Sequence, residues 1–119
     1  MTSMINSFRD LMVWQKSLVL VSEIYKVTAD FPGTEMYGLI NQMRRAAVSI
    51  PSNIAEGYGR RSTGEYKRFL QISVGSLYEL QTQIEISFRL SYLTAAAHLQ
   101  LLEKVIELDR MMFALIKKL

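Results

Sequence analysis

The sequence predicts an all-α protein, an antiparallel up-down-up-down four-helix bundle formed by a single domain over residues 1–119. Apolar residues recur at alternating spacings of three and four, which is the pattern of a helix face. Only Pro32 and Pro51 punctuate the chain, and no Val/Ile/Thr-rich alternating run is bounded by hairpin turns. Its 119 residues, 50% of them hydrophobic, suit one packed core.

The first two helices are expected over about residues 10–30 and 35–56. On the first helix, the stripe expected to face the core is Leu11, Trp14, Leu18, Val21, Tyr25 and Thr28. Phe31-Pro32-Gly33 ends this helix. The second helix carries its stripe straight through Pro51. Because proline removes one backbone hydrogen bond and clashes with the carbonyl four residues back, we expect a kinked helix there.

The third and fourth helices are expected over about residues 63–90 and 95–118. Ser62 with Glu65 three residues later matches the capping-box pattern, and Thr94 is a suitable cap for the fourth helix. The residues of the third helix expected to face the core are Tyr66, Leu70, Ser73, Leu77, Leu80, Ile84 and Phe88. Four helices joined by short loops favour up-down-up-down packing.

A second apolar stripe on the first helix predicts a further subunit. A four-helix monomer buries one stripe per helix, and large exposed apolar patches usually mark interfaces. The expected oligomer interface comprises Val13, Leu20, Ile24, Val27, Tyr37, Arg44, Ile72, Tyr78 and Ile86. Arg44 is expected to pair there with a carboxylate. The alternative is a broad core face with scattered surface apolar residues, which are normal.

Positive charge is concentrated in residues 41–68. This segment holds six basic and two acidic residues, whereas the whole chain has a net charge of +3. The loop before the third helix leads to backbone amides that favour phosphate. The expected nucleic-acid interface is Arg45, Arg60, Arg61, Lys67 and Arg68. No base-reading motif is visible, so low sequence specificity is expected, and ordinary solvated or ion-paired side chains are the alternative.

The chain lacks residues on which many catalytic sites depend. The chain has no cysteine, and His98 is its only histidine. Thiol chemistry, a Ser/His/Asp relay and a multi-histidine metal site are therefore excluded or incomplete. We expect His98 on a helix surface, and we expect no enzymatic activity, no metal and no cofactor.

Four residues near the end of the second helix are expected to have structural roles. Asn53 can bond carbonyls freed by Pro51, and Glu56 can pair with a loop arginine. Gly57 is expected to help reverse the chain before the third helix.

Several runs of residues resemble a known family. Phe8-Arg9-Asp10-Leu11 and Glu35-Met36-Tyr37-Gly38-Leu39 are followed by a more distinctive block at residues 42–57, QMRRAAVSIPSNIAEG. These runs resemble the four-helix-bundle proteins encoded in intervening sequences of 23S rRNA genes, the S23 ribosomal protein-like family. The resemblance covers about residues 8–93. It implies a four-helix bundle assembled as a homopentamer and, from related proteins, a basic surface that binds nucleic acid.

Together these observations predict a non-enzymatic homo-oligomer, a pentamer by resemblance, that binds RNA or DNA. The alternative is a scaffold whose assembled surface holds a partner protein without binding nucleic acid. Dependence of binding on salt distinguishes the two. Uncharged runs are far shorter than the roughly 20 apolar residues of a membrane-spanning helix, so we expect no membrane segment and a cytoplasmic location.

Overall fold

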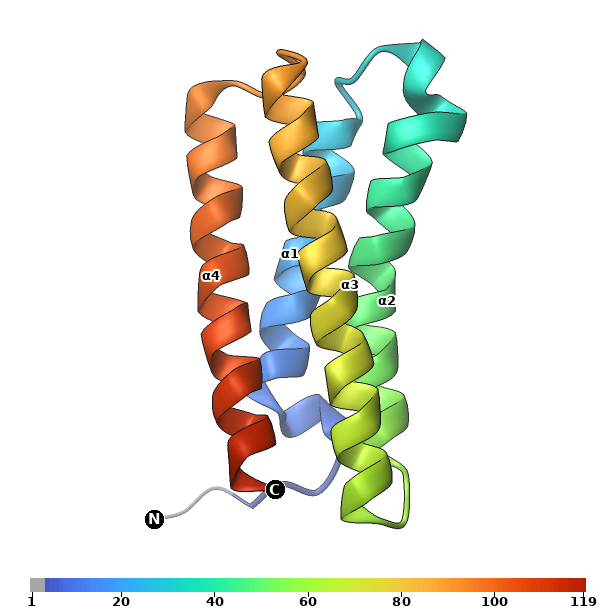
Figure 1. The fold of residues 1–119 in the computed structure, drawn as a ribbon, viewed down its shortest axis with the longest axis vertical. Coiled ribbons are helices and arrows are strands. Elements are labelled where there is room, and N and C mark those ends of the chain that lie inside the picture. The colour runs from blue at the N-terminus through green and yellow to red at the C-terminus, as the bar shows by residue number, and fades with distance from the viewer. Residues whose placement is uncertain (1–3) are drawn as a thin grey trace.

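The computed structural model describes residues 4–119, which form four long α-helices and three short helical turns (Figure 1). The long helices are α1 (Met12–Thr28), α2 (Asn41–Tyr58), α3 (Thr63–Arg89) and α4 (Ala95–Lys118). The short turns are η1 (Phe8–Asp10), η2 (Gly33–Glu35) and η3 (Met36–Ile40). No strand occurs within this described range, which confirms the all-α prediction.

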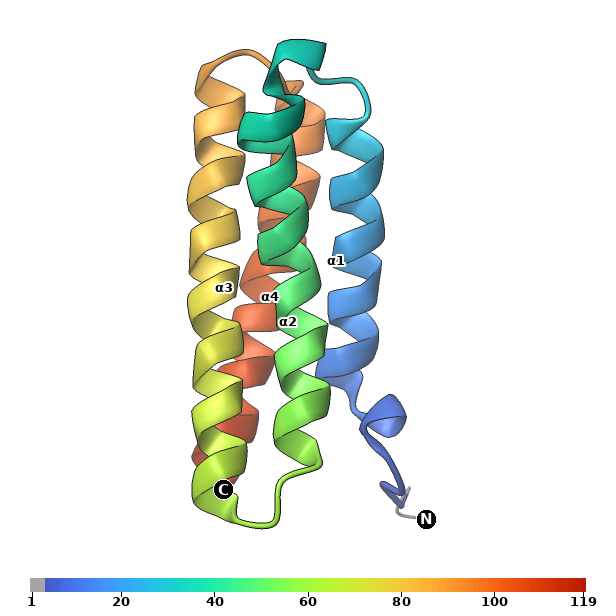
Figure 2. The ribbon, with the colours of Figure 1, turned by 90° about the vertical axis from the view of Figure 1, so that its right-hand side faces the viewer.

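The four helices lie side by side along the 45 Å long axis of the molecule. The α2–α3 loop lies at one end, and the α1–α2 and α3–α4 connections lie at the other (Figure 1). Each helix packs mainly against two neighbours, because α2 contacts α1 and α3 while α4 contacts α3 and α1. The α1–α2 pair and the α3–α4 pair therefore form opposite faces of the bundle (Figure 2).

Side-chain caps mark the starts of α3 and α4. Ser62 Oγ accepts from the Glu65 backbone N–H at 3.1 Å, and Thr94 caps α4 in the same way, as predicted. Only the Ser62 half of the predicted capping box is present, because the Glu65 side chain pairs with Arg68 instead. The N-terminal turn has a capping box of its own between Ser7 and Asp10, which the sequence pattern did not reveal. This box sets η1 apart, so that α1 begins at Met12 rather than at residue 10.

Helix α2 continues through Pro51, as predicted. The residue with a non-helical backbone is Gly38, which lies in η3 before α2 begins. Asn53 Nδ2 donates to the Ser49 carbonyl at 2.8 Å and to the Ser49 hydroxyl at 3.0 Å. The carbonyl that Pro51 leaves without its helical donor is that of Ala47, four residues back. Asn53 therefore braces the preceding turn of α2 and does not replace the bond that proline removes.

The face of α1 that packs into the core is the one that the sequence pattern assigns to an oligomer interface. Val13, Leu20 and Ile24 are only 5%, 1% and 0% exposed, so their predicted role between subunits is wrong. Leu18 and Tyr25, expected in the core, are 39% and 43% exposed. Both stripes are apolar, and the rotation of α1 about its own axis decides which stripe faces the core.

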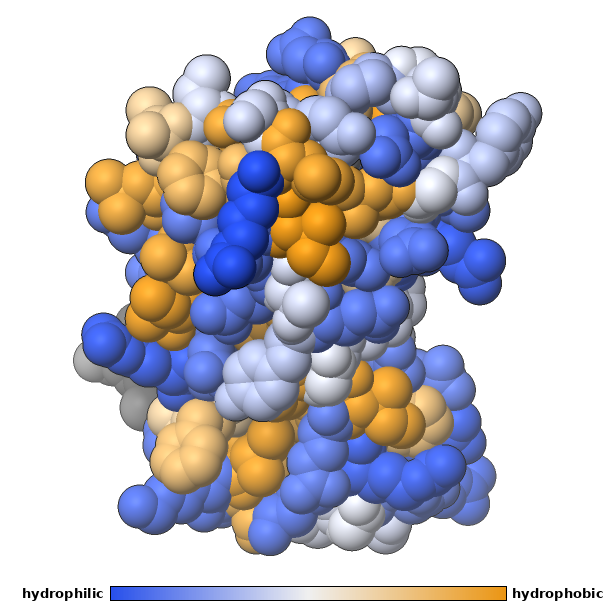
Figure 3. Space-filling view, turned by 45° about the horizontal axis from the view of Figure 1, so that its top comes forward, coloured by the Kyte–Doolittle hydropathy of each residue, from blue (hydrophilic) through white to orange (hydrophobic). Residues whose placement is uncertain are grey.

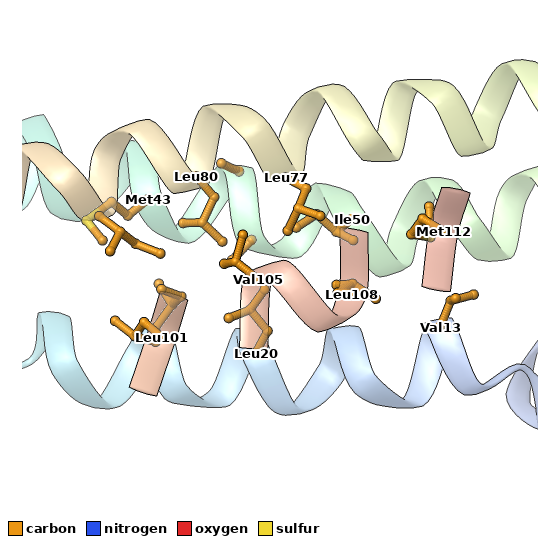
Figure 4. Packing of buried hydrophobic residues seen from close by; sticks show 14 of the residues in the cluster. Val13, Leu20, Met43, Ile50, Leu77, Leu80, Leu101, Val105, Leu108 and Met112 are labelled. Atoms are coloured by element: carbon orange, nitrogen blue, oxygen red, sulfur yellow. The ribbon is translucent and has the colours of Figure 1, made fainter. Parts of the chain in front are cut away.

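The core combines side chains from all four helices (Figure 4). Its members include Leu20 from α1, Ile50 from α2, Leu77 from α3 and Leu108 from α4. Val27 is partly buried against this cluster, and its predicted place in a subunit contact stays a prediction.

Gly57 lies in the last turn of α2 and is buried, whereas the sequence pattern places it in the chain reversal. A Cβ at this position would lie 2.6 Å from the Phe69 Cβ and 3.3 Å from the Tyr66 backbone oxygen. Real Cβ atoms do not approach another carbon so closely, so only glycine allows α2 to pack this tightly on α3.

Gly57→Ala is expected to lower the free energy of unfolding by about 1–3 kcal/mol, because the added methyl group forces α2 and α3 apart. The matched control is Gly75→Ala in α3, where an added Cβ meets nothing within 4 Å. That change should stabilise the helix by roughly 0.5–1 kcal/mol. Urea unfolding followed by circular dichroism measures both, and equal effects at the two positions would contradict the packing role of Gly57.

Candidate nucleic-acid interface

The basic residues of the segment 41–68 form two separate groups in the structure. Arg44 and Arg45 lie near the start of α2, whereas Arg60, Arg61, Lys67 and Arg68 surround the α2–α3 loop. At about 1.5 Å of helix rise per residue, Arg45 lies roughly 20 Å from the loop group. The structure therefore does not bring Arg45 beside the other predicted nucleic-acid-binding residues.

Two arginines of the loop group cover one buried aromatic ring. The guanidinium carbon of Arg60 lies 4.7 Å from the centroid of Phe69, and that of Arg68 lies 5.6 Å from it. Arg60 also bonds Glu56 at 2.8 Å, the pairing expected for Glu56, and Arg68 bonds Glu65 at 3.4 Å. These contacts hold both guanidinium groups at the surface at the end of the bundle.

The remaining positive charges of the predicted interface are unpaired. Within residues 4–119, Arg45, Arg61 and Lys67 have no carboxylate within 4.0 Å. The four basic residues of the loop group, set against Glu56 and Glu65, give this end a local net charge of +2.

The start of α3 is partly occupied by its own cap. The Ser62 hydroxyl accepts from the Glu65 amide, which removes one of the amide donors expected to face phosphate. Tyr58 and Tyr66 lie close by, with ring centroids 5.9 Å apart in an edge-to-face arrangement. Burial raises the pKa of Tyr66, with a smaller contribution from Tyr58.

Arg44 ties α2 to the last turn of α1. Its Nε donates to the Thr28 hydroxyl at 2.9 Å, and its guanidinium also donates to the Tyr25 carbonyl at 3.3 Å. The same group lies 4.5 Å from the centroid of the Tyr25 ring. A cation is favourable at a helix C-terminus. The partners of Arg44 within the chain are thus a hydroxyl, a carbonyl and an aromatic ring, and its pairing with a carboxylate at a subunit contact stays a prediction.

Four other residues of the predicted oligomer interface are exposed. Tyr37, in η3, is 94% exposed, and Ile72, Tyr78 and Ile86 lie on the outer side of α3. The Tyr78 hydroxyl donates to Asp109 at 3.0 Å, and this hydrogen bond is the main cause that raises the pKa of Tyr78. Tyr78 and Ile86 line a groove between α3 and α4.

An apolar groove lies on the opposite face, between α1 and α2. It has a volume of about 270 Å³ and is lined by Trp14, Leu18, Val21, Val48, Pro51, Ser52 and Ala55. The sequence pattern places Trp14, Leu18 and Val21 in the core, so this groove was not foreseen. Apolar residues also gather in several patches on the face in Figure 3, where hydrophilic side chains separate them.

His98 lies between helices rather than on the surface, as its side chain is only 17% exposed. Its ring stacks on Phe88 with centroids 4.0 Å apart, and its Nε2 lies 3.3 Å from a Glu85 carboxylate oxygen. Arg89 also donates to Glu85, and this bond is the main cause that lowers the pKa of Glu85. Among residues 4–119, no three potential metal ligands come together.

Comparison with known proteins decides the family. The model of the family described as "23S rRNA-intervening sequence protein" matches residues 9–114. The chain belongs to this family. The match confirms the resemblance seen in residues 42–57.

A solved structure has the same fold as this member of the intervening-sequence protein family. It is a protein of unknown function from the S23 ribosomal protein family of Bacteroides thetaiotaomicron, 23% identical to this chain. The similarity covers 89% of this chain and 99% of that one, with a TM-score of 0.80. No curated protein matches the chain. Within residues 4–119, no helix has the length and apolar character to cross a bilayer.

Arg44→Met is expected to lower the free energy of unfolding by about 1–2 kcal/mol, because it removes two hydrogen bonds and the contact with the Tyr25 ring. Arg45→Met, one residue along α2, removes an exposed and unpaired charge and should change stability by less than about 0.5 kcal/mol. Thermal unfolding of the two variants tests this, and a loss no greater for Arg44 than for Arg45 would show that the tie between α1 and α2 is energetically unimportant.

Proposed function

We propose that this chain is a non-enzymatic, cytoplasmic, homo-oligomeric protein that binds RNA or DNA through its basic surface with low sequence specificity. In this proposal its up-down-up-down bundles assemble as a homopentamer. The observation that carries nucleic-acid binding is the loop end of the bundle. There Arg61 and Lys67 are unpaired, and the guanidinium groups of Arg60 and Arg68 are held over Phe69.

Assembly would multiply a modest charge. In a cyclic oligomer every loop end lies on the same rim. Five copies at a local net charge of +2 then place about ten positive charges on one rim, enough for several phosphate contacts and strong salt dependence.

The two opposite grooves support a cyclic assembly. The apolar groove between α1 and α2 differs in composition from the groove that Tyr78 and Ile86 line between α3 and α4. A contact that joins two different faces is heterologous, and it generates a ring when the rotation closes. Joining these faces would bury Leu18 and Val48 of one copy against the next.

The α1–α2 groove is also the observation that favours the alternative function. A scaffold that holds a partner protein needs an accessible apolar surface, and this groove provides one. In that case the basic residues serve solubility, and nucleic acid does not bind.

The double variant Arg61→Gln with Lys67→Gln is expected to weaken binding of a labelled structured RNA by roughly tenfold or more at 0.1 M salt and to flatten the salt dependence. The matched control is Lys26→Gln with Arg110→Gln, which removes two charges from exposed positions on other helices. Fluorescence anisotropy at several salt concentrations measures each affinity. If both double variants lose the same affinity for RNA, the net charge of the protein explains the loss and the loop end is not the binding site. If no RNA binds even at low salt, the scaffold function is favoured.

Leu18→Glu is expected to lower the mass of the oligomer, because it places a charge in the α1–α2 groove without disturbing the core of the monomer. Val19→Glu is the control, since Val19 is exposed on the same helix but outside the groove. Light scattering measures the mass. A wild-type protein that is monomeric, or a Leu18→Glu variant with unchanged mass, would overturn this interface.

A further inference from the structure

A polar cleft lies beside Arg45, at the end of α2 away from the loop group of basic residues. It lies between α2 and α3, has a volume of about 350 Å³ and contains only one apolar residue, Ala46. The six polar residues that line it are Asn41, Gln42, Arg45, Ser49, Ser76 and Glu79. It therefore differs from the apolar groove on the other side of α2.

Some of these polar groups already have partners. The hydroxyls of Ser49 and Ser76 are 2.9 Å apart and bridge the two helices. Glu79 accepts a 3.4 Å hydrogen bond from the buried amide of Gln83, one turn further along α3. The serine pair thus links α2 to α3 within the cleft, and Gln83 contacts one oxygen of the Glu79 carboxylate.

The groups best suited to bind a ligand are free. In the part of the chain that the structure describes, the side chains of Asn41, Gln42 and Arg45 form no hydrogen bond, and Arg45 and Glu79 form no ion pair with each other. A cation and a carboxylate thus line the same cleft without neutralising each other at contact distance. A ligand that accepts hydrogen bonds on one edge and donates them on another would satisfy both.

Guanine has this arrangement of donors and acceptors. Its O6 and N7 accept two parallel hydrogen bonds, which arginine supplies in a bidentate manner. Its N1–H and 2-amino group form a second edge of two donors, which a carboxylate accepts. None of the other three bases presents both a pair of acceptors and a pair of donors in this way.

We infer that the α2–α3 cleft binds an unpaired guanine base of an RNA, a specificity that rests on the proposed nucleic-acid binding. Arg45 bonds O6 and N7, and Glu79 accepts from N1–H and the 2-amino group. Asn41 and Gln42 supply further amide donors and acceptors. A paired base cannot enter a cleft between two helices, so the base comes from a loop, bulge or single strand.

The position of the cleft sets a spacing along the RNA. It lies roughly 20 Å from the loop group, which corresponds to about six stacked nucleotides at about 3.4 Å each. An RNA whose backbone lies against Arg61 and Lys67 therefore reaches the cleft of the same copy about six nucleotides further along. The loop group supplies affinity that does not depend on sequence, and the cleft selects one base.

Three matched hairpin RNAs test the inference. Each carries a uridine loop with one central purine: guanosine, inosine, which lacks the 2-amino group, or 7-deazaguanosine, which lacks N7. The wild-type protein is expected to bind the guanosine RNA about five- to tenfold more tightly than either analogue. Glu79→Gln should remove the difference between guanosine and inosine and keep the difference from 7-deazaguanosine. Glu103→Gln, an exposed change on α4, should keep both.

The outcomes separate this inference from the proposed function. Equal affinity for the three RNAs, with steep salt dependence, overturns guanine binding and leaves the proposed nucleic-acid binding standing. No binding to any of them at low salt overturns both. A preference for guanosine over inosine that survives Glu79→Gln, in a protein whose circular dichroism and light-scattering mass are unchanged, also overturns the assignment to this cleft.

Discussion

The close approach of α2 to α3 is the constraint on which both candidate binding regions depend. Gly57 permits it at the loop end, where a Cβ would collide with Phe69. Further along, Ser73 donates to the Ile50 carbonyl, and the hydroxyls of Ser49 and Ser76 bridge the two helices. These small side chains let the helices approach closely, and the hydrogen bonds satisfy their hydroxyl groups. This packing places the arginines around Phe69 and also forms the polar cleft.

The position of α1 then decides what remains on the surface. Two apolar stripes compete for the core, and hydrophobic burial alone is non-directional. Arg44 binds the last turn of α1 through Tyr25 and Thr28 and so links that turn to α2. The stripe with Leu20 is buried, whereas the stripe with Trp14 borders a groove. A surface of this kind suits assembly, which is also what would gather the loop ends into one basic rim.

The two basic groups differ in what they offer a polyanion. At the loop end, ion pairs with Glu56 and Glu65 leave a modest local excess of charge, and the arginines rest on an aromatic ring that limits their motion. Arg45 has no ion-pair partner among the described residues, and it lines the same polar cleft as the Glu79 carboxylate. The first arrangement suits a phosphate backbone, and the second suits a base edge.

The sequence by itself determined the features that act over a few residues. Helical periodicity, the caps at Ser62 and Thr94 and the pairing of Glu56 with Arg60 four residues on are all local, and the distinctive block at residues 42–57 identified the family. Only the tertiary structure decided which stripe of α1 is buried, that Gly57 meets Phe69, and that His98 stacks on Phe88. These contacts join residues on different turns and helices, so they depend on the rotation and spacing of helices that no single segment encodes.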